Sequence, residues 1–264
     1  MNDSYISLGP INILIAAGFV MLAGLISVFF QLGLLKKLAV GMARTALQLL
    51  LAGAALATVF GLQHIGLVLL LGLVMTLLAG REVMARLKVK LKGAGMDALL
   101  TMTITSFVVA VMVTGVVIGA KPFWKPSVFI PLLGMILGNS LNGISLSLDS
   151  FLTTCAKQRH RIEARLALGA SPNEALQPIV REAIRTGMIP MTNAMAIVGI
   201  VSLPGMMTGQ LIAGADPMDA VMYQIVVMYM LAAAVALGSS GVVLLARKRV
   251  MNRDMTLRQE LTGY

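Results

Sequence analysis

Apolar segments long enough to cross a lipid bilayer recur along this chain, and they constrain its fold more than any other feature. A helix needs about 17 to 25 mostly apolar residues to span the hydrocarbon core. Such segments lie at 11–31, 40–60, 64–80, 98–118, 128–151, 188–211 and 220–245. With 58% hydrophobic and only 12% charged residues, the chain has too few polar side chains to cover these segments in a water-soluble fold. The sequence predicts an all-α polytopic membrane protein with about seven transmembrane helices.

Two of these segments are interrupted, so that roughly five to eight spans are compatible with the pattern. Arg44 and Gln48 stand inside the second. Pro204, Gly205 and Gly209 stand inside the sixth, where proline and paired glycines predict a helix break.

The basic residues mark one face of the membrane. All 21 lysines and arginines except Lys121 and Lys125 fall in or beside alternate loops. They lie within 36–44, 81–92, 157–185 and 247–258. The positive-inside rule then predicts an N-terminus outside and a C-terminus in the cytoplasm, in the cell inner membrane. Anionic membrane lipid accounts for the net charge of +10, so no nucleic-acid partner is expected.

One transmembrane domain is expected over 1–264, and its longest polar interval is about 152–187. Ser171 followed by Pro172 is typical of a helix start, and Glu174 would complete a capping box. Gly169 can end the preceding helix in the left-handed conformation. The interval therefore predicts a cytoplasmic helix-turn-helix, with an ordinary amphipathic surface loop as the alternative.

This interval resembles the cytoplasmic coupling loop of ABC-transporter permeases. Glu163, Ala164, Gly169 and Ile179 occur at the spacing of that family's loop. The chain departs from the pattern at Arg165, which replaces an alanine, and at Arg181-Glu182, which replace Leu-Pro.

A wider resemblance covers roughly 40–247 and is concentrated after residue 128. Its motifs are Ile130-Pro131-Leu132-Leu133-Gly134-Met135-Ile136-Leu137-Gly138-Asn139-Ser140, Leu168-Gly169-Ala170-Ser171-Pro172, Val201-Ser202-Leu203-Pro204-Gly205-Met206-Met207-Thr208-Gly209-Gln210 and Gly214-Ala215-Asp216-Pro217. They resemble the FetB family of permeases, bacterial relatives of the plant aluminium-sensitive permease. The resemblance implies export of iron or a related metal ion, driven by a FetA-like ATPase subunit that holds ATP and Mg.

The sequence itself contains no Gly-x-x-x-x-Gly-Lys-Ser/Thr phosphate loop, so energy must come from a partner or an ion gradient. We expect no enzyme activity and no cofactor on this chain. Because one chain would form half of a permease, we also expect a homodimer. The residues expected to contact the ATPase are Glu163, Ala164, Arg165, Gly169, Ala170, Ser171, Pro172, Arg181 and Arg185. The alternative for the arginines is a role as positive-inside anchors.

Polar residues inside the spans are candidates for a translocation pathway, because polar groups are costly at bilayer depth. Asn139, Asn142, Ser145 and Asp149 recur at helical spacing, and Asn193 could face the same stripe. Their oxygens are hard ligands suited to a metal cation, although no ligand set is defined. Alternatively, the stripe packs helices together beside small residues such as Gly134 and Gly138. Arg44 could extend its side chain to the membrane interface as an anchor, or it could pair with Asp149.

The interrupted sixth span is a candidate gate, formed by Pro204, Gly205, Met206, Met207 and Gly209. Thioether ligation by the two methionines is the less favoured reading, since the chain has 20 methionines and most would pack. Asp216 and Asp219 could attract cations at the outer mouth, but turn and helix-cap roles are more usual.

Two other function classes remain open. A gradient-driven secondary transporter of a metal or small solute is the main alternative, although no inverted repeat is evident. An intramembrane enzyme is disfavoured because His64 and His160 are expected on opposite sides of the membrane.

Overall fold

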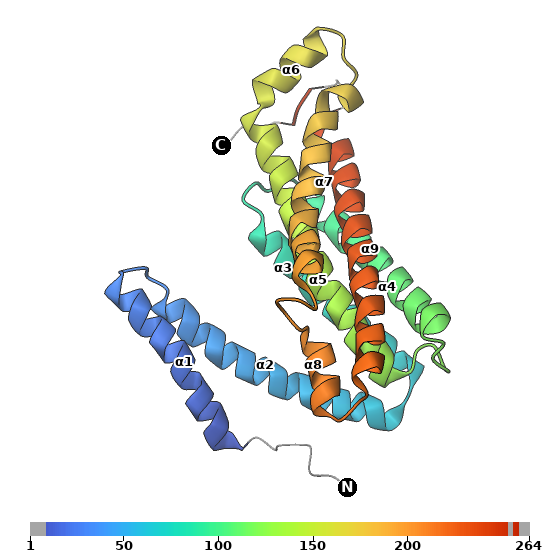
Figure 1. Cartoon of the computed structure of the whole chain (residues 1–264). Coiled ribbons are helices and arrows are strands. Elements are labelled where there is room, and N and C mark those ends of the chain that lie inside the picture. The colour runs from blue at the N-terminus through green and yellow to red at the C-terminus, as the bar shows by residue number, and fades with distance from the viewer. Residues whose placement is uncertain (1–8, 253–255, 259–264) are drawn as a thin grey trace.

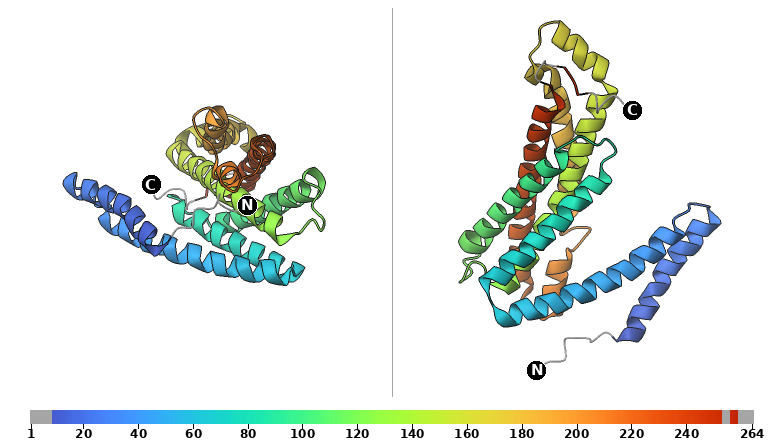
Figure 2. Two further views of the ribbon diagram at one scale, coloured as in Figure 1. Left: turned by 60° about the horizontal axis from the view of Figure 1, so that its bottom comes forward. Right: turned by 180° about the vertical axis from the view of Figure 1, so that it is seen from behind.

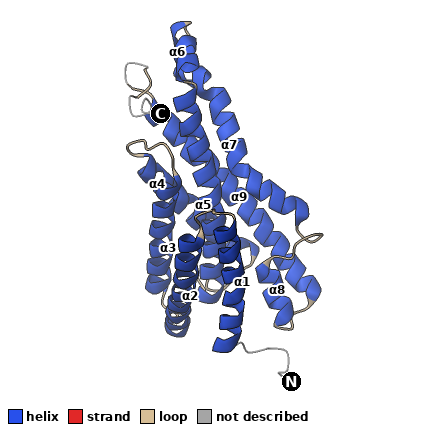
Figure 3. Ribbon diagram, turned by 90° about the vertical axis from the view of Figure 1, so that its left-hand side faces the viewer, coloured by secondary structure: helices blue, strands red, loops and turns tan. Residues whose placement is uncertain are grey.

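The structure is a computed structural model that describes residues 9–252 and 256–258. Figure 1 shows the chain, and Figure 3 shows that the described residues form helices joined by short connections. The elements are α1 (Pro10–Phe29), α2 (Leu35–Leu62), α3 (Ile65–Arg86), α4 (Ala94–Met112), η1 (Val113–Val117), α5 (Pro126–Lys157), α6 (Arg159–Ala167), α7 (Pro172–Ile197), α8 (Gly205–Ile212) and α9 (Pro217–Val250).

Six stretches of helix in the described part of the chain are long and apolar enough to cross a membrane. They are α1, α2, α3, α4 with η1, α5 and α9, and their mean hydropathies run from 1.5 to 2.4. The predicted class, an all-α polytopic membrane protein, is confirmed.

The predicted span at 188–211 does not form one helix. Its first part is the end of α7, which stops at Ile197, and its last part is the short helix α8. Between them, Gly199 has a φ of +81° and its N–H bonds to the carbonyl oxygen of Ser202 at 2.9 Å. Proline and positive-φ glycine end helices, so the break predicted around Pro204 occurs and begins earlier, at Val198.

The bundle has two ends of different character (Figure 1). One end carries α6, the α3–α4 loop and the end of α9, so most of the basic segments gather there. The other end carries α8, the α8–α9 turn and the loop that contains Lys121 and Lys125. This arrangement is the one that alternate basic loops predict. We call the first end the basic end.

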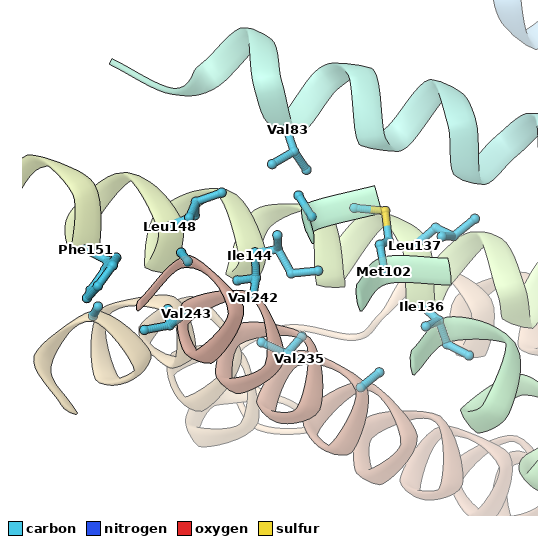
Figure 4. Packing of buried hydrophobic residues seen from close by; sticks show 14 of the residues in the cluster. Val83, Met102, Ile136, Leu137, Ile144, Leu148, Phe151, Val235, Val242 and Val243 are labelled. Atoms are coloured by element: carbon cyan, nitrogen blue, oxygen red, sulfur yellow. The ribbon is translucent and has the colours of Figure 1, made fainter. Parts of the chain in front are cut away.

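The core lies where α5 packs against α7 and α9, with α3 and α4 on its other side (Figure 2). Figure 4 shows Ile144, Leu148 and Phe151 of α5 among Val235 and Val242 of α9. All five side chains are buried. The three helices cross closely because small residues face one another at the crossing.

Gly143 of α5, Gly187 of α7 and Ser239 of α9 form that crossing. A Cβ atom on Gly187 would lie 2.7 Å from the carbonyl oxygen of Gly143 and 2.8 Å from Ser239 Oγ. A Cβ atom on Gly143 would lie 2.6 Å from a methyl group of Val235. Contact between helices in lipid depends on such close packing, because lipid tails are as apolar as the side chains.

The α1–α2 hairpin leans away from this bundle (Figures 1 and 2). Helix α2 meets the bundle near its C-terminal end, where Val59 is buried, and Arg44 is exposed. The pairing of Arg44 with Asp149 does not occur within the protomer. Asp149 Oδ1 instead accepts a hydrogen bond from the backbone N–H of Lys88 at 2.8 Å.

An ion pair joins the start of α4 to the end of α9. Arg249 donates to both carboxylate oxygens of Asp97, with Nη2 at 2.8 Å from Oδ1, and the Asp97 side chain is only 4% exposed. Gly93, with a φ of +90°, lets the guanidinium approach, since a Cβ atom there would lie 2.5 Å from Arg249 Nη1. We call this contact the Asp97–Arg249 clasp.

Replacing Gly187 with alanine should destabilise the bundle by about 1–3 kcal/mol, because the added methyl group meets a backbone oxygen that cannot move aside easily. The free energy of unfolding can be measured by SDS titration in mixed micelles. Gly138→Ala is the matched control, since a Cβ atom at Gly138 meets nothing within 4 Å. Equal stability of the two variants would contradict the close crossing.

Asp97→Asn should lower the free energy of unfolding by about 1–3 kcal/mol, because it removes a buried charge partner from Arg249. Glu82→Gln breaks an exposed pair with Arg86 and should cost less than about 1 kcal/mol. The same titration compares the two. If Asp97→Asn lowers the free energy of unfolding no more than Glu82→Gln does, the clasp does not stabilise the fold beyond an exposed ion pair.

Candidate functional site

The predicted helix-turn-helix is present at the basic end. Helix α6 ends at Ala167, and Gly169 follows with a φ of +94°. Ser171 caps α7: its Oγ accepts from the N–H of Glu174 at 3.3 Å, while Glu174 Oε2 accepts from the N–H of Ser171 at 2.8 Å. Pro172 is the first residue of α7, as expected. We call residues 159–175 the coupling segment.

Buried side chains and polar contacts hold the coupling segment in place. Ile162 and Leu176 are buried, and Arg165 Nη1 donates to the carbonyl oxygen of Ala175 at 3.4 Å. Glu163 pairs with Arg159 across one helical turn, with Nε and Oε1 2.6 Å apart. These contacts give Arg165 and Glu163 structural roles within the segment.

The tip of the coupling segment presents an apolar side chain that the sequence interpretation missed. Leu168 is 88% exposed, although leucine usually buries its side chain. Ala164, Gly169 and Ser171 are exposed around it. Nothing in the local sequence distinguishes Leu168 from the buried leucines nearby, because its exposure follows from the direction in which the turn leaves α6.

The other residues predicted to contact an ATPase divide by exposure. Arg181 and Arg185 are exposed on α7, whereas Ala170 and Pro172 are half-buried at the turn. Their surfaces are therefore available to a partner at the basic end, and contact with one stays a prediction.

The polar stripe of α5 lies on a face that the protomer leaves partly uncovered. Asn142 is exposed, and a side chain at Gly138 would meet nothing within 4 Å. Asn139 Nδ2 donates within its own helix to the carbonyl oxygen of Met135 at 3.0 Å. The close packing within the protomer uses Gly143, which lies one turn after Asn139. A Cβ atom at Gly134 would meet only the Cε of Met75, at 3.3 Å.

Part of this stripe borders a cavity of about 480 Å³ between α3, α5 and α7, which we call the Arg86 pocket. It is lined by Arg86, Lys88, Asn142, Ser145, Leu146, Asp149 and Pro190. Three of the five predicted pathway residues, Asn142, Ser145 and Asp149, therefore come together. Asn139 and Asn193 are not among the lining residues, and Asn193 lies exposed on α7.

Arg86 and Lys88 are the charged residues of this pocket that the sequence interpretation missed. The sequence alone assigns both to the basic loop 81–92, as markers of membrane orientation. Arg86 Nη1 donates to Asn142 Oδ1 at 2.8 Å, across a separation of 56 residues. No local pattern could have indicated a contact over that distance.

A second cavity of about 470 Å³ lies beside the broken helix, toward the end opposite to the basic end. It is lined by Met195, Val198, Gly199, Leu203, Met207, Val221, Gln224, Ile225, Met228 and Tyr229. Gln224 is 6% exposed, and its Oε1 has no hydrogen-bond partner. The predicted gate thus borders a mostly apolar chamber.

Among the predicted gate residues, only Met207 lines that chamber. Pro204 caps α8 and Gly205 is its first residue, and a side chain at Gly205 or Gly209 would meet nothing within 4 Å. Met206 packs against the core. The gate role of these residues stays a prediction.

Metal ligation finds little support in side chains of the usual kind. No group of three or more His, Cys, Asp or Glu that could hold a metal ion occurs in residues 9–252 and 256–258. Asp216 accepts hydrogen bonds from the N–H groups of Met218 and Asp219, at 2.8 and 3.2 Å. That is the helix-cap geometry expected for this aspartate.

Comparisons with known proteins identify relatives along most of the chain. Residues 10–251 match the model of the uncharacterised protein family UPF0014. A membrane protein of this family from Synechocystis sp. is 36% identical over 216 residues, which cover 81% of this chain and 83% of that protein. No solved structure matches significantly.

Two further relatives carry descriptive names. The probable iron export permease protein FetB of Escherichia coli is 30% identical over 228 residues, covering 86% of each chain. The protein ALUMINUM SENSITIVE 3 of Arabidopsis thaliana is 31% identical over 223 residues, covering 83% of this chain and 79% of that protein.

The capping box of α7 should respond to pH through Glu174. The hydroxyl of Ser171, and then its backbone N–H, lower the pKa of the Glu174 carboxyl. A lowered folded-state pKa means that the stabilisation is present above the ordinary glutamate pKa and is lost as the pH falls through the folded value. Ser171→Ala should return the pKa toward its ordinary range. The carboxyl carbon shift of ¹³C-labelled glutamate measures this.

Asn173→Ala is the control for that titration, because Asn173 is exposed in the same turn. Its substitution should leave the Glu174 titration in place. If Ser171→Ala leaves the titration of Glu174 unchanged, the capping box does not exist in solution.

Proposed function

This chain belongs to the UPF0014 family, and from that premise we propose that it is the permease subunit of an ABC transporter that exports iron or a related metal ion. The observation that carries the proposal is the coupling segment, a capped turn that presents exposed Leu168 at one end of the bundle. The similarity to a probable iron export permease supports the substrate.

The proposal assigns ATP hydrolysis to a separate FetA-like subunit. The sequence contains no phosphate-binding loop of the Gly-x-x-x-x-Gly-Lys-Ser/Thr kind, so this chain needs an external source of energy. ATP and Mg would be held by the ATPase. This chain would supply the docking surface and the path through the membrane.

The basic end faces the cytoplasm in this proposal. The positive-inside rule supports that orientation, because the basic segments gather at the end that carries α6 (Figure 1). The N-terminus would then lie outside and the C-terminus inside the cell inner membrane. A cytoplasmic ATPase could reach the coupling segment.

Helix α7 links the docking surface to the broken helix. It runs without interruption for 26 residues from Pro172 to Ile197, or roughly 40 Å. Its first turn follows Leu168, and its last residues border the chamber that contains Met207 and Gln224. Movement of the tip when the ATPase closes would therefore reach the break at Val198 through one continuous helix.

A homodimer would complete the path. Ile200 and Val201, in the non-helical segment after α7, are 87% and 77% exposed in the protomer. Non-helical backbone at membrane depth is tolerated where protein covers it or where it lines a water-filled cavity. A second copy would meet that need and would also face the uncovered side of α5 at Gly138 and Asn142.

We expect this chain to stimulate ATP hydrolysis by its ATPase partner in liposomes, and iron to raise the rate further. Leu168→Asp should weaken association about tenfold or more, because it places a charge at the centre of an apolar contact. The basal rate of the ATPase alone should not change. Hydrolysis rate and co-purification are measured together.

Lys90→Asp is the matched control, since it adds the same charge at an exposed position of the α3–α4 loop at the same end. It should stimulate hydrolysis like the unaltered chain. If Leu168→Asp also does so, the tip is not the docking surface. If the unaltered chain never associates with an ATPase, a gradient-driven transporter becomes the better description.

A further inference from the structure

The polar residues that line the Arg86 pocket include hydrogen-bond donors. Arg86 uses two of its five N–H donors on known partners, Glu82 at 3.1 Å and Asn142 at 2.8 Å. Ser145 is 5% exposed and its Oγ has no hydrogen-bond partner, although it lines the pocket. A buried hydroxyl without a partner is costly, and a ligand in the pocket could accept the hydrogen bond of Ser145.

Two of the oxygens that would attract a bare cation already accept hydrogen bonds. Asn142 Oδ1 accepts from the Arg86 guanidinium, and Asp149 Oδ1 accepts from the backbone N–H of Lys88. Two basic side chains, Arg86 and Lys88, line the cavity against one carboxylate. A free metal ion would lie beside the Arg86 guanidinium, whereas an anionic oxygen would find N–H and O–H donors.

The location of the pocket suits an entrance. Arg86 is in the last turn of α3, next to the basic end, and its side chain is 45% exposed. Helix α5 runs toward the basic end, so Asp149 lies nearest that end, followed by Ser145 and then by Asn142, the partner of Arg86. A solute that arrives from the basic end would meet Ser145 before it reaches the guanidinium.

We propose that the Arg86 pocket binds the oxyanion of an anionic solute, with Arg86 and Ser145 donating to its oxygens. The consequence rests on the proposed function: the exported metal enters as a complex with carboxylate or phosphate ligands. The fork of the guanidinium matches the two oxygens of either group. Its cavity of about 480 Å³ is larger than a bare ion needs.

Binding to the full chain in nanodiscs of zwitterionic phosphatidylcholine tests this by isothermal titration calorimetry. The probes are citrate, inorganic phosphate, ferric citrate and ferrous ion in a non-coordinating buffer. Citrate or phosphate should bind, and Arg86→Gln should weaken that binding about tenfold or more, because a charge-assisted contact is lost. Ser145→Ala, which keeps the Arg86 contacts, should weaken it by a smaller factor.

Arg81→Gln is the matched control, because Arg81 is an exposed arginine of the same helix that does not line the pocket. It should bind the oxyanion like the unaltered chain. The inference is overturned if neither oxyanion binds, or if Arg86→Gln binds as tightly as the unaltered chain. It is also overturned if ferrous ion alone binds and Arg86→Gln strengthens its binding.

A lipid headgroup could supply the same phosphate chemistry, and a second arm separates it from a soluble solute. The chain is purified with anionic phosphatidylglycerol, and retained lipid is measured by mass spectrometry. Retention that is lost in Arg86→Gln and that blocks citrate and phosphate would overturn the soluble-anion assignment. Stimulation of the ATPase by the chain itself does not require oxyanion binding. If no oxyanion binds while the chain still stimulates the ATPase, this inference fails and the proposed function stands.

Discussion

The crossing of α5, α7 and α9 at Gly143, Gly187 and Ser239 is the contact on which the rest of the structure depends. In lipid the hydrophobic effect does not drive helices together, so their association relies on close packing and on polar contacts. Backbone meets backbone here, since the Cβ position of Gly187 is 2.7 Å from the carbonyl oxygen of Gly143. The crossing holds α7 in a fixed position against α5, which carries the polar stripe.

That fixed position places three candidate functional features along one helix. The coupling segment precedes α7, the Arg86 pocket is bordered by Pro190 in its second half, and the chamber beside Met207 begins at Met195. All three therefore share α7 as a common element. The Asp97–Arg249 clasp holds α4 against α9 in a comparable way at the basic end.

Basic residues near the membrane boundary have more than one role in this chain. Positive-inside anchoring explains why they gather at one end. It does not explain why Arg86 donates to an asparagine within α5, or why Arg249 binds a carboxylate that is almost completely buried. The guanidinium group suits both roles, because it stays charged and offers several donors in a planar arrangement.

The sequence by itself determined the features that depend on short segments. Hydropathy predicted an all-α membrane protein, the Ser171-Pro172-x-Glu174 pattern predicted the start of α7, Gly169 predicted the end of the preceding helix, and Pro204 predicted a break. Each of these rests on interactions within a few residues, or on the average polarity of one helix, and so can be derived without the fold.

Only the tertiary structure decided which faces meet. A helix in lipid is apolar on all sides, so no amphipathic pattern shows which side packs, and Gly143 could not be preferred over Gly138. The contact between Arg86 and Asn142, the exposure of Leu168 and the division of the span at 188–211 between α7 and α8 follow from the relative placement of distant segments. Because hydropathy sums over local windows, it carries no information on such placement.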